Sequence, residues 1–459
     1  MAGIVAIYGY DSNTHKNNNI IYYLAHSMRR LQHRGKAYWK MIVGEGAAGA
    51  EGSLPADETI LRIAQKEKLR GNNGIGYLSK RPPLFPSMNS IWVVFDGFFV
   101  DTEKLHLHPY IGSARDSDPL FKIYHIFTQL LILEKNPERA AEFLDRHLRG
   151  NLMIKVADRI YVYRDRTGFK PLVSATNRDK TLYIIASENS LRTSLSKMEF
   201  ADVKAGQLLK IDKYNGLEVL TSESTIRLMM DPFEFIRESN VVATVNGKSI
   251  YQIRKNIGRE QANFLSKELD VDLAFAEPDY TRPMTLGFSL EYQKHSKVFE
   301  LAEGVIKDRY DDADHMIDFS EQVSKNKLLT TGRSLKFIIQ NLVHGKKIAT
   351  VQGTIQTGST TRETIYYLKN NGAKRIDVAV SYVPTVDGRQ VGLYTQNRDL
   401  IANKYMGKVS SINELNQNIA RELGADSLYY NSPVVLAKGI GVSENDLWFP
   451  EWVRFIDYK

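Results

Sequence analysis

A short run of small and hydroxyl-bearing residues stands between a predicted buried strand and a predicted helix. It consists of Thr357, Gly358, Ser359, Thr360 and Thr361. The free N–H groups at the start of a helix, together with side-chain hydroxyl groups, can hold a phosphate. The same pattern also fits a plain strand-to-helix connection in which Ser or Thr caps the helix. Both interpretations stay open: a candidate phosphate-binding turn and a structural cap.

Basic residues gather near the start of the chain, where they could attract a polyanion. The sequence holds 61 Lys and Arg against 53 Asp and Glu, and no acidic residue occurs between Asp11 and Glu45. A basic field of this kind favours nucleic acid as a partner, although it also fits an ordinary solvated surface. The candidate polyanion-binding residues are Arg29, Arg30, Arg34, Lys36, Lys40, Lys80 and Arg81, and a second basic cluster nearby adds Lys66, Lys68 and Arg70.

The composition excludes several kinds of chemistry. The chain of 459 residues has no Cys, which rules out disulfide bonds, zinc–cysteine sites and thiolate catalysis. We expect neither a metal site nor a cofactor. No apolar run is long enough to cross a bilayer, and the first residues lack the pattern of a secretory signal. We therefore expect a cytoplasmic protein without a membrane partner.

The elements that must position these residues change in character along the chain. In the first half, strand-like runs such as 1–9 and 90–99 surround helical stretches at 20–31 and 119–134. This order favours an α+β sandwich. In the second half, buried strands at 272–276, 347–351 and 375–381 alternate with helices at 248–267 and 361–370. That alternation is typical of a parallel sheet in an α/β domain, so we divide the chain into domains at 1–235 and 236–459.

Several motifs follow one another along nearly the whole chain. They include Gly-Ile-Val at 3–5, Leu-Gln-His-Arg-Gly at 31–35, Ala-Ser-Glu at 186–188 and Gly-Ala-Asp-Ser-Leu at 424–428. In this order they resemble the glutamine phosphoribosylpyrophosphate amidotransferases. The resemblance implies an N-terminal nucleophile hydrolase-like α+β sandwich followed by an α/β phosphoribosyltransferase-like domain. In that family the first domain releases ammonia from glutamine, and the second uses the ammonia in purine synthesis.

The residues that the resemblance assigns to glutamine hydrolysis are replaced. Ala2 stands where the family has its nucleophilic cysteine, and it has no nucleophilic atom. Ser79 stands at the arginine that holds the substrate carboxylate. Asp96 stands at the asparagine of the oxyanion hole, where negative charge opposes the developing oxyanion. We therefore expect no glutaminase activity.

The residues that the resemblance assigns to phosphoribosyl transfer are replaced as well. The family uses two adjacent carboxylates to grip the ribose hydroxyls, and these positions are Gln352 and Gly353 here. An amide and a hydrogen atom cannot reproduce paired anionic acceptors.

Three functions stay open, of which a catalytically inactive pseudoenzyme that acts by binding or regulation is preferred. Its partner could be a second copy of itself or an active amidotransferase, joined in a homo-oligomer or hetero-oligomer. The first alternative is an RNA- or ribosome-associated factor, for example in hibernation or assembly, that uses the basic first domain. The second alternative is a residual ammonia-dependent phosphoribosyltransferase in purine synthesis.

Overall fold

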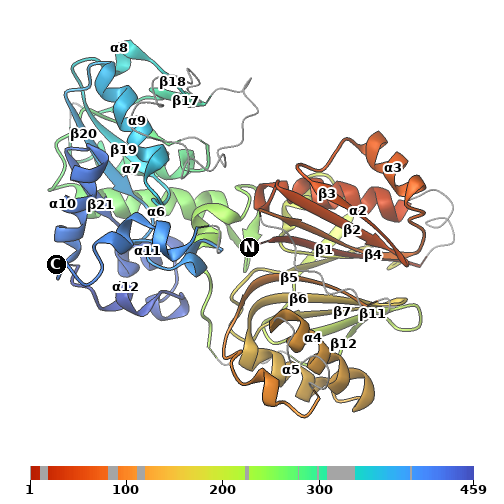
Figure 1. Ribbon diagram of the computed structural model, residues 1–459. Coiled ribbons are helices and arrows are strands. Elements are labelled where there is room, and N and C mark those ends of the chain that lie inside the picture. Colours follow the sequence, from red (N-terminus) through yellow and green to blue (C-terminus); the bar gives the residue numbers. More distant parts are fainter. Residues whose placement is uncertain are drawn as a thin grey trace.

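Two antiparallel sheets and two pairs of helices build the first half of the chain (Figure 1). A computed structural model describes residues 2–10, 19–80, 91–110, 119–222, 227–277, 279–296, 299–307, 336–392 and 395–458. The first sheet has the order β10-β8-β9-β1-β4-β2-β3 and the second has the order β12-β11-β7-β6-β5. Helices α2 and α3 cover the first sheet, and α4 and α5 cover the second.

The strands and helices of the first half have the following residue ranges. The first sheet contains β1 (Ala2–Gly9), β2 (Tyr38–Val43), β3 (Gly46–Glu51), β4 (Asn73–Ser79), β8 (Val173–Asn177), β9 (Leu182–Ala186) and β10 (Met198–Asp202). The second contains β5 (Ile91–Phe99), β6 (Leu148–Val156), β7 (Arg159–Arg164), β11 (Leu208–Asp212) and β12 (Gly216–Val219). The helices are α2 (Asn19–Arg30), α3 (Asp57–Lys66), α4 (Pro119–Thr128) and α5 (Pro137–His147).

Strand β1 lies at the centre of this sandwich, and its sequence explains why. Side chains of a strand alternate between the two faces of its sheet. Ile4 and Ala6 therefore face the apolar layer between the sheets, while Val5 and Ile7 face the layer beneath α2. Both sets are fully buried, as the run of small and β-branched residues predicts.

A parallel sheet forms the core of the second half, with the strand order β16-β15-β19-β20-β21. Its strands are β15 (Leu273–Ala276), β16 (Glu300–Leu301), β19 (Lys347–Gln352), β20 (Arg375–Val380) and β21 (Ser427–Tyr430). Two small antiparallel pairs accompany it: β13 (Thr244–Val245) with β14 (Lys248–Ser249), and β17 (Val305–Lys307) with β18 (Lys336–Ile338). The helices are α6 (Ile250–Leu265), α7 (Arg282–Tyr292), α8 (Gln340–Val343), α9 (Ser359–Asn370), α10 (Ile412–Leu423), α11 (Pro433–Ile440) and α12 (Glu451–Phe455).

The segment between the two halves is itself buried. A single wide helical turn, Glu234–Glu238, carries the chain from the first sandwich towards α6. The C-terminal region returns to meet this junction, because Met230 and Leu447 form an isolated parallel bridge. The Trp448 ring packs against Phe98 and Phe169 of the first half, with centroids 5.5 and 5.9 Å apart.

The predicted strands and helices are confirmed, with shifted ends. The predicted helix 119–134 is an α-helix only to Thr128, and a π-helical turn continues it to Leu133. The predicted helix 248–267 begins at Ile250, because Lys248 and Ser249 pair with β13 and the Ser249 side chain caps the helix. In the part of the chain that the structure describes, no helix is both long and apolar enough to cross a membrane.

Candidate functional site

The three first-domain positions singled out in the sequence lie together in the structure. Ala2 pairs with Ser79 across β1 and β4. The backbone N–H of Ala2 donates a hydrogen bond of 2.8 Å to Oδ1 of Asp96, which lies on β5 of the facing sheet. The three residues are 1%, 3% and 1% exposed. They therefore form one closed cluster between the two sheets.

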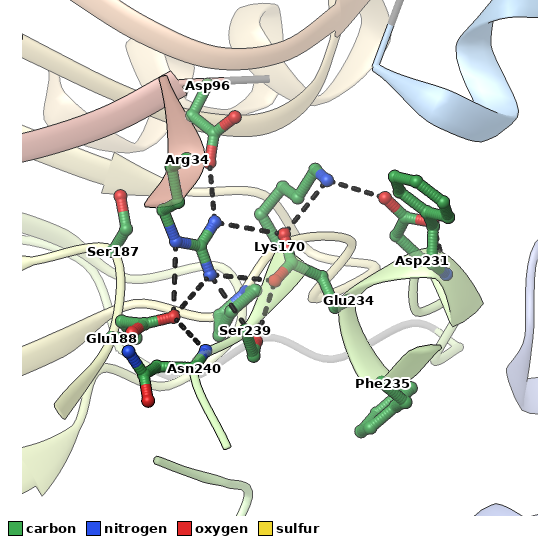
Figure 2. Close-up of polar contacts among 12 residues, drawn as sticks. Arg34, Asp96, Lys170, Ser187, Glu188, Asp231, Glu234, Phe235, Ser239 and Asn240 are labelled. Carbon is green, nitrogen blue, oxygen red and sulfur yellow. Dashed lines mark hydrogen bonds and ion pairs between the residues drawn. The ribbon is translucent and has the colours of Figure 1, made fainter. Parts of the chain in front are cut away.

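Arg34 extends this cluster into a buried network of charges (Figure 2). Its Nη1 lies 3.6 Å from Oδ2 of Asp96. Its Nε and Nη2 donate to Oε2 of Glu188 at 3.2 and 3.0 Å, and its Nη1 and Nη2 donate to the two carboxylate oxygens of Glu234 at 3.1 and 2.7 Å. The Arg34 side chain is completely buried, so these carboxylates take the place of water around its charge.

Lys170 holds the other side of the network. Its Nζ donates to Asp231 at 2.5 Å and to Glu234 at 2.9 Å. Ser239 donates to Glu234 at 2.8 Å, and the backbone N–H of Asn240 donates to Glu188 at 3.1 Å (Figure 2). The segment from Asp231 to Asn240 is thus joined to the first sandwich by side chains and by backbone.

Arg254 of α6 binds the same segment from the second half of the molecule. Its Nε donates to the carbonyl oxygen of Phe235 at 2.9 Å, and its Nη2 donates to that of Ser239 at 2.7 Å. Arg34 therefore holds the carboxylates of this segment while Arg254 holds its carbonyl groups. Together the two arginines join the sandwich, the connecting segment and α6.

The network holds more carboxylates than cations. The pKa of one of its carboxyl groups is lowered and the pKa values of two others are raised. Burial alone would raise the pKa of Glu188, yet His33 and Arg34 together lower it to about 2. Burial raises the pKa of Asp231 to about 6, against the opposing effect of Lys170. Burial also raises the pKa of Asp96 above its usual range. His33 lies within 3.1 Å of Glu188, as expected for a packed histidine.

The structure corrects the candidate polyanion-binding residues. The prediction that Arg34 binds a polyanion is wrong, because this side chain is completely buried within the network and cannot reach a partner. Lys40 lies 4.9 Å from the centre of the Trp92 ring and is only partly exposed, and Arg29 is paired with Asp57 at 2.6 Å. Lys80 is partly buried, and Arg81 lies outside the described residues. Of the basic residues singled out in the sequence, Arg30, Lys36, Lys66, Lys68 and Arg70 are exposed.

The second-domain positions lie at the carboxyl end of β19, where parallel sheets commonly bind ligands. Gln352 is buried, and its side-chain amide donates to Glu277 at 3.3 Å. The hydroxyl of Thr364 donates to the same Glu277 oxygen at 3.1 Å. The next residue, Gly353, lies directly against the ring of Tyr280. These contacts fill the region with side chains of the protein itself.

The hydroxyl-rich turn leads into α9, as predicted. Gly358 has a left-handed backbone with φ of 81°, which favours glycine, and no side chain caps the helix at this position. Thr357 and Ser359 hydroxyls lie 3.0 Å apart and are exposed, together with Thr360, while Thr361 is buried. The Thr357 hydroxyl accepts a hydrogen bond of 3.4 Å from the Ser359 N–H at the start of the helix, so the structural cap and the phosphate-binding turn both stay predictions. Among the described residues, no group of three or more His, Cys, Asp or Glu side chains is arranged to hold a metal ion.

The network itself could not be found from the sequence. Arg34 lies in a basic stretch, and its main partners are 154 and 200 residues away. Arg34 and Glu188 each belong to a motif named above, but the motifs do not show that the two side chains meet.

Comparisons with known proteins agree with this architecture. No protein-family model matches the chain. The amidophosphoribosyltransferase of Methanothermobacter thermautotrophicus is 25% identical over 470 residues, which cover 97% of this chain and 92% of that protein. The enzyme of Bacillus subtilis is 24% identical over 471 residues, which cover 97% and 90%. The solved glutamine phosphoribosylpyrophosphate amidotransferase of B. subtilis, complexed with ADP and GMP, aligns with a TM-score of 0.72 and 22% identity over 97% of this chain and 95% of that one.

The fold is therefore an N-terminal nucleophile hydrolase-like sandwich joined to a phosphoribosyltransferase-like α/β domain, as the sequence predicted. Within that class, the chain is a relative of the amidophosphoribosyltransferases over nearly its whole length.

Asp231 and Glu188, whose pKa values are shifted in opposite directions, give opposite pH dependences of stability. Asp231 binds a proton more tightly in the folded state, because its pKa rises from 3.8 to about 6. Its contribution to the free energy of unfolding is therefore lost as the pH rises through this interval. We expect wild type to lose stability relative to Asp231→Asn as the pH rises from 4 to about 6, measured by chemical denaturation.

Glu188→Gln is the matched comparison. Because the pKa of Glu188 is lowered in the folded state, wild type gains stability relative to this variant as the pH rises through about 2 to 4.5. A difference from Asp231→Asn that does not change with pH would contradict the assignment of Asp231.

Proposed function

We propose that this chain is a non-catalytic relative of the amidophosphoribosyltransferases and acts by binding or regulation. The observation that carries the proposal is the contact between the Ala2 N–H and the buried Asp96 carboxylate. In a glutaminase of this fold, the resemblance requires a nucleophile at Ala2 and neutral hydrogen-bond donors at Asp96. Here a methyl group and an anion stand at these positions.

The charges around Asp96 support the same proposal. Arg34 is not available to a substrate carboxylate, because it already binds Glu188 and Glu234 and lies beside Asp96. Ser79, at the position of the substrate-binding arginine, is buried and pairs with Ala2 across the sheet. Glutamine would have to displace an internal ion-pair network to enter this space.

The second domain adds independent support. Gln352 uses its amide in a contact with Glu277, and a β-carbon at Gly353 would lie 2.2 Å from the Tyr280 ring. A carboxylate at Gly353 therefore has no room while Tyr280 stays in place. The turn at Thr357–Thr361 remains our candidate for holding a phosphate group, because its exposed hydroxyls stand at the start of α9.

A partner of the same fold suits such a protein. An active amidotransferase or a second copy of this chain could use the surfaces through which related subunits associate.

Restoring the nucleophile alone should not restore glutamine hydrolysis. We expect Ala2→Cys and wild type to release ammonia from glutamine only at the rate of a protein-free control. The reason is that Asp96 still opposes an oxyanion and Ser79 still offers no cation for the substrate carboxylate. An ammonia assay measures this, with the B. subtilis enzyme as positive control. Glutamine-dependent ammonia from Ala2→Cys would show that the pocket has been assigned to the wrong residues.

Residual phosphoribosyl transfer is the alternative to be tested separately. With phosphoribosylpyrophosphate, Mg²⁺ and excess ammonia, we expect no pyrophosphate release above background, because the paired carboxylates are absent at Gln352 and Gly353. Ammonia bypasses the first domain, so only the second domain is tested. Pyrophosphate release that depends on both ammonia and this protein would contradict the non-catalytic proposal. It would identify the chain as an ammonia-dependent transferase.

An RNA- or ribosome-associated role is a second candidate, favoured by the exposed basic side chains of the first half. Arg30 and Lys36 lie near the end of α2, where Arg29 contacts Asp57 at the start of α3. Lys66, Lys68 and Arg70 lie at the other end of α3, about 14 Å further along the helix. These basic residues therefore lie in two groups, one near the end of α2 and one at the far end of α3.

Charge reversal tests this candidate directly. We expect wild type to sediment with ribosomes at low salt and to dissociate steeply as salt rises, because counterions are released from phosphates on binding. Changing Arg30, Lys36, Lys66, Lys68 and Arg70 to Glu should abolish binding. Changing the exposed Lys267, Lys369, Lys374, Lys408 and Arg421 of the second half to Glu should leave binding intact. Wild type that stays free at low salt, or two variants that behave alike, would rule the candidate out.

A further inference from the structure

Tyr280 lies against the backbone just after the carboxyl end of β19. It comes from the loop that joins β15 to α7, and its ring packs against Gly353 in the turn after β19. A β-carbon on Gly353 would lie 2.2 Å from Cε2 and 2.6 Å from the hydroxyl oxygen of Tyr280. Only glycine at this position allows the ring to lie so close to the backbone.

The floor beneath the ring is fixed by hydrogen bonds. Gln352 and Thr364 both donate to Glu277, and the Thr361 hydroxyl donates to the side-chain amide oxygen Oε1 of Gln352 at 3.4 Å. These contacts tie the end of β19 to the first turns of α9 and to the loop that carries Tyr280. The turn itself therefore does not have to move when the ring does.

Arg237 lies on the same ring from the connecting segment. Its guanidinium carbon is 5.2 Å from the ring centroid, a distance at which a cation attracts an aromatic face. Arg237 belongs to the turn Glu234–Glu238, whose Glu234 binds Arg34 and Lys170 in the buried network. The ring thus contacts both the second-domain turn and the segment that joins the two halves.

We propose that Tyr280 is a gate that closes the second-domain site of this chain, and that Arg237 holds the gate shut. The ligand class that the gate excludes is a pentose 5-phosphate, because the ring occupies the space beside Gln352 and Gly353, where the family resemblance places the ribose. Opening requires the ring to leave both Gly353 and Arg237. The gate concerns ligand access rather than catalysis, so it goes beyond the proposed function and is tested by binding alone.

A double-mutant cycle tests the steric part without any ligand. Gly353→Ala should lower the melting temperature of wild type by several degrees, because the new methyl group collides with the ring. The same substitution should have little effect in a Tyr280→Ala background, where the ring is absent. Tyr280→Phe keeps the ring and should behave like wild type towards Gly353→Ala. Equal effects in all three backgrounds would overturn the gate.

Ligand binding tests the functional part, with ribose 5-phosphate as the probe in calorimetry. Tyr280→Ala should bind about tenfold or more tightly than wild type, because a gate that is mostly closed lowers apparent affinity by the open fraction. Arg237→Met should increase affinity in the same direction but less, and Tyr280→Phe should not. Equal affinity in wild type and Tyr280→Ala, or no binding to either, would overturn the proposal. Because neither outcome depends on product formation, failure here is distinct from failure of the non-catalytic assignment.

Discussion

The completely buried guanidinium group of Arg34 is the constraint on which the arrangement of the two halves depends. A buried charge is tolerated only when opposite charges and hydrogen bonds replace its water, and removing one partner of such a group costs about 3–5 kcal/mol. Arg34 meets this requirement with Glu188 from its own sandwich and Glu234 from the connecting segment. Because Glu234 also binds Lys170, the segment cannot leave the sandwich without exposing several unpaired charges at once. Arg254 then fixes the same segment to α6, so one local requirement is transmitted to the second half.

The sequence predicted well those features that depend on neighbouring residues. The run of small and β-branched residues at 3–7 and the strand–helix alternation after residue 270 are local, and both halves of the fold followed from them. Arg34 was misjudged because its sequence neighbours Arg30 and Lys36 are exposed bases, whereas its own partners come from distant parts of the chain. The contact between Tyr280 and Gly353 was missed for the same reason, because the two residues are 73 positions apart in the chain and meet only in three dimensions. Contacts between elements, rather than the elements themselves, were beyond reach of sequence patterns.

Gly353 and Tyr280 constrain each other in a way that makes the second-domain change difficult to reverse by one substitution. The backbone at Gly353 leaves no space for a β-carbon while the ring is present, so an acidic side chain there requires Tyr280 to move first. Position 352 is constrained as well, because the Gln352 amide donates to Glu277. A carboxylate at this position would place two anions side by side. The chemistry of a ribose grip and the packing now present are therefore alternatives, and they cannot coexist in this conformation.

Asp96 has a structural role in the first domain. A carboxylate at this position cannot stabilise an oxyanion, but it can accept the Ala2 N–H and lie beside the Arg34 guanidinium, which a neutral amide would do less well. The feature that argues against hydrolysis is therefore a member of the network that holds the connecting segment. A return to amide at Asp96 would remove one anion from a cluster that already holds more carboxylates than cations, and would favour the remaining carboxylates in their charged form. Its effect on stability would thus reach Asp231 and the connecting segment, because all of these groups share the charges of Arg34 and Lys170. The first sandwich and the connecting segment consequently respond together to a change at Asp96.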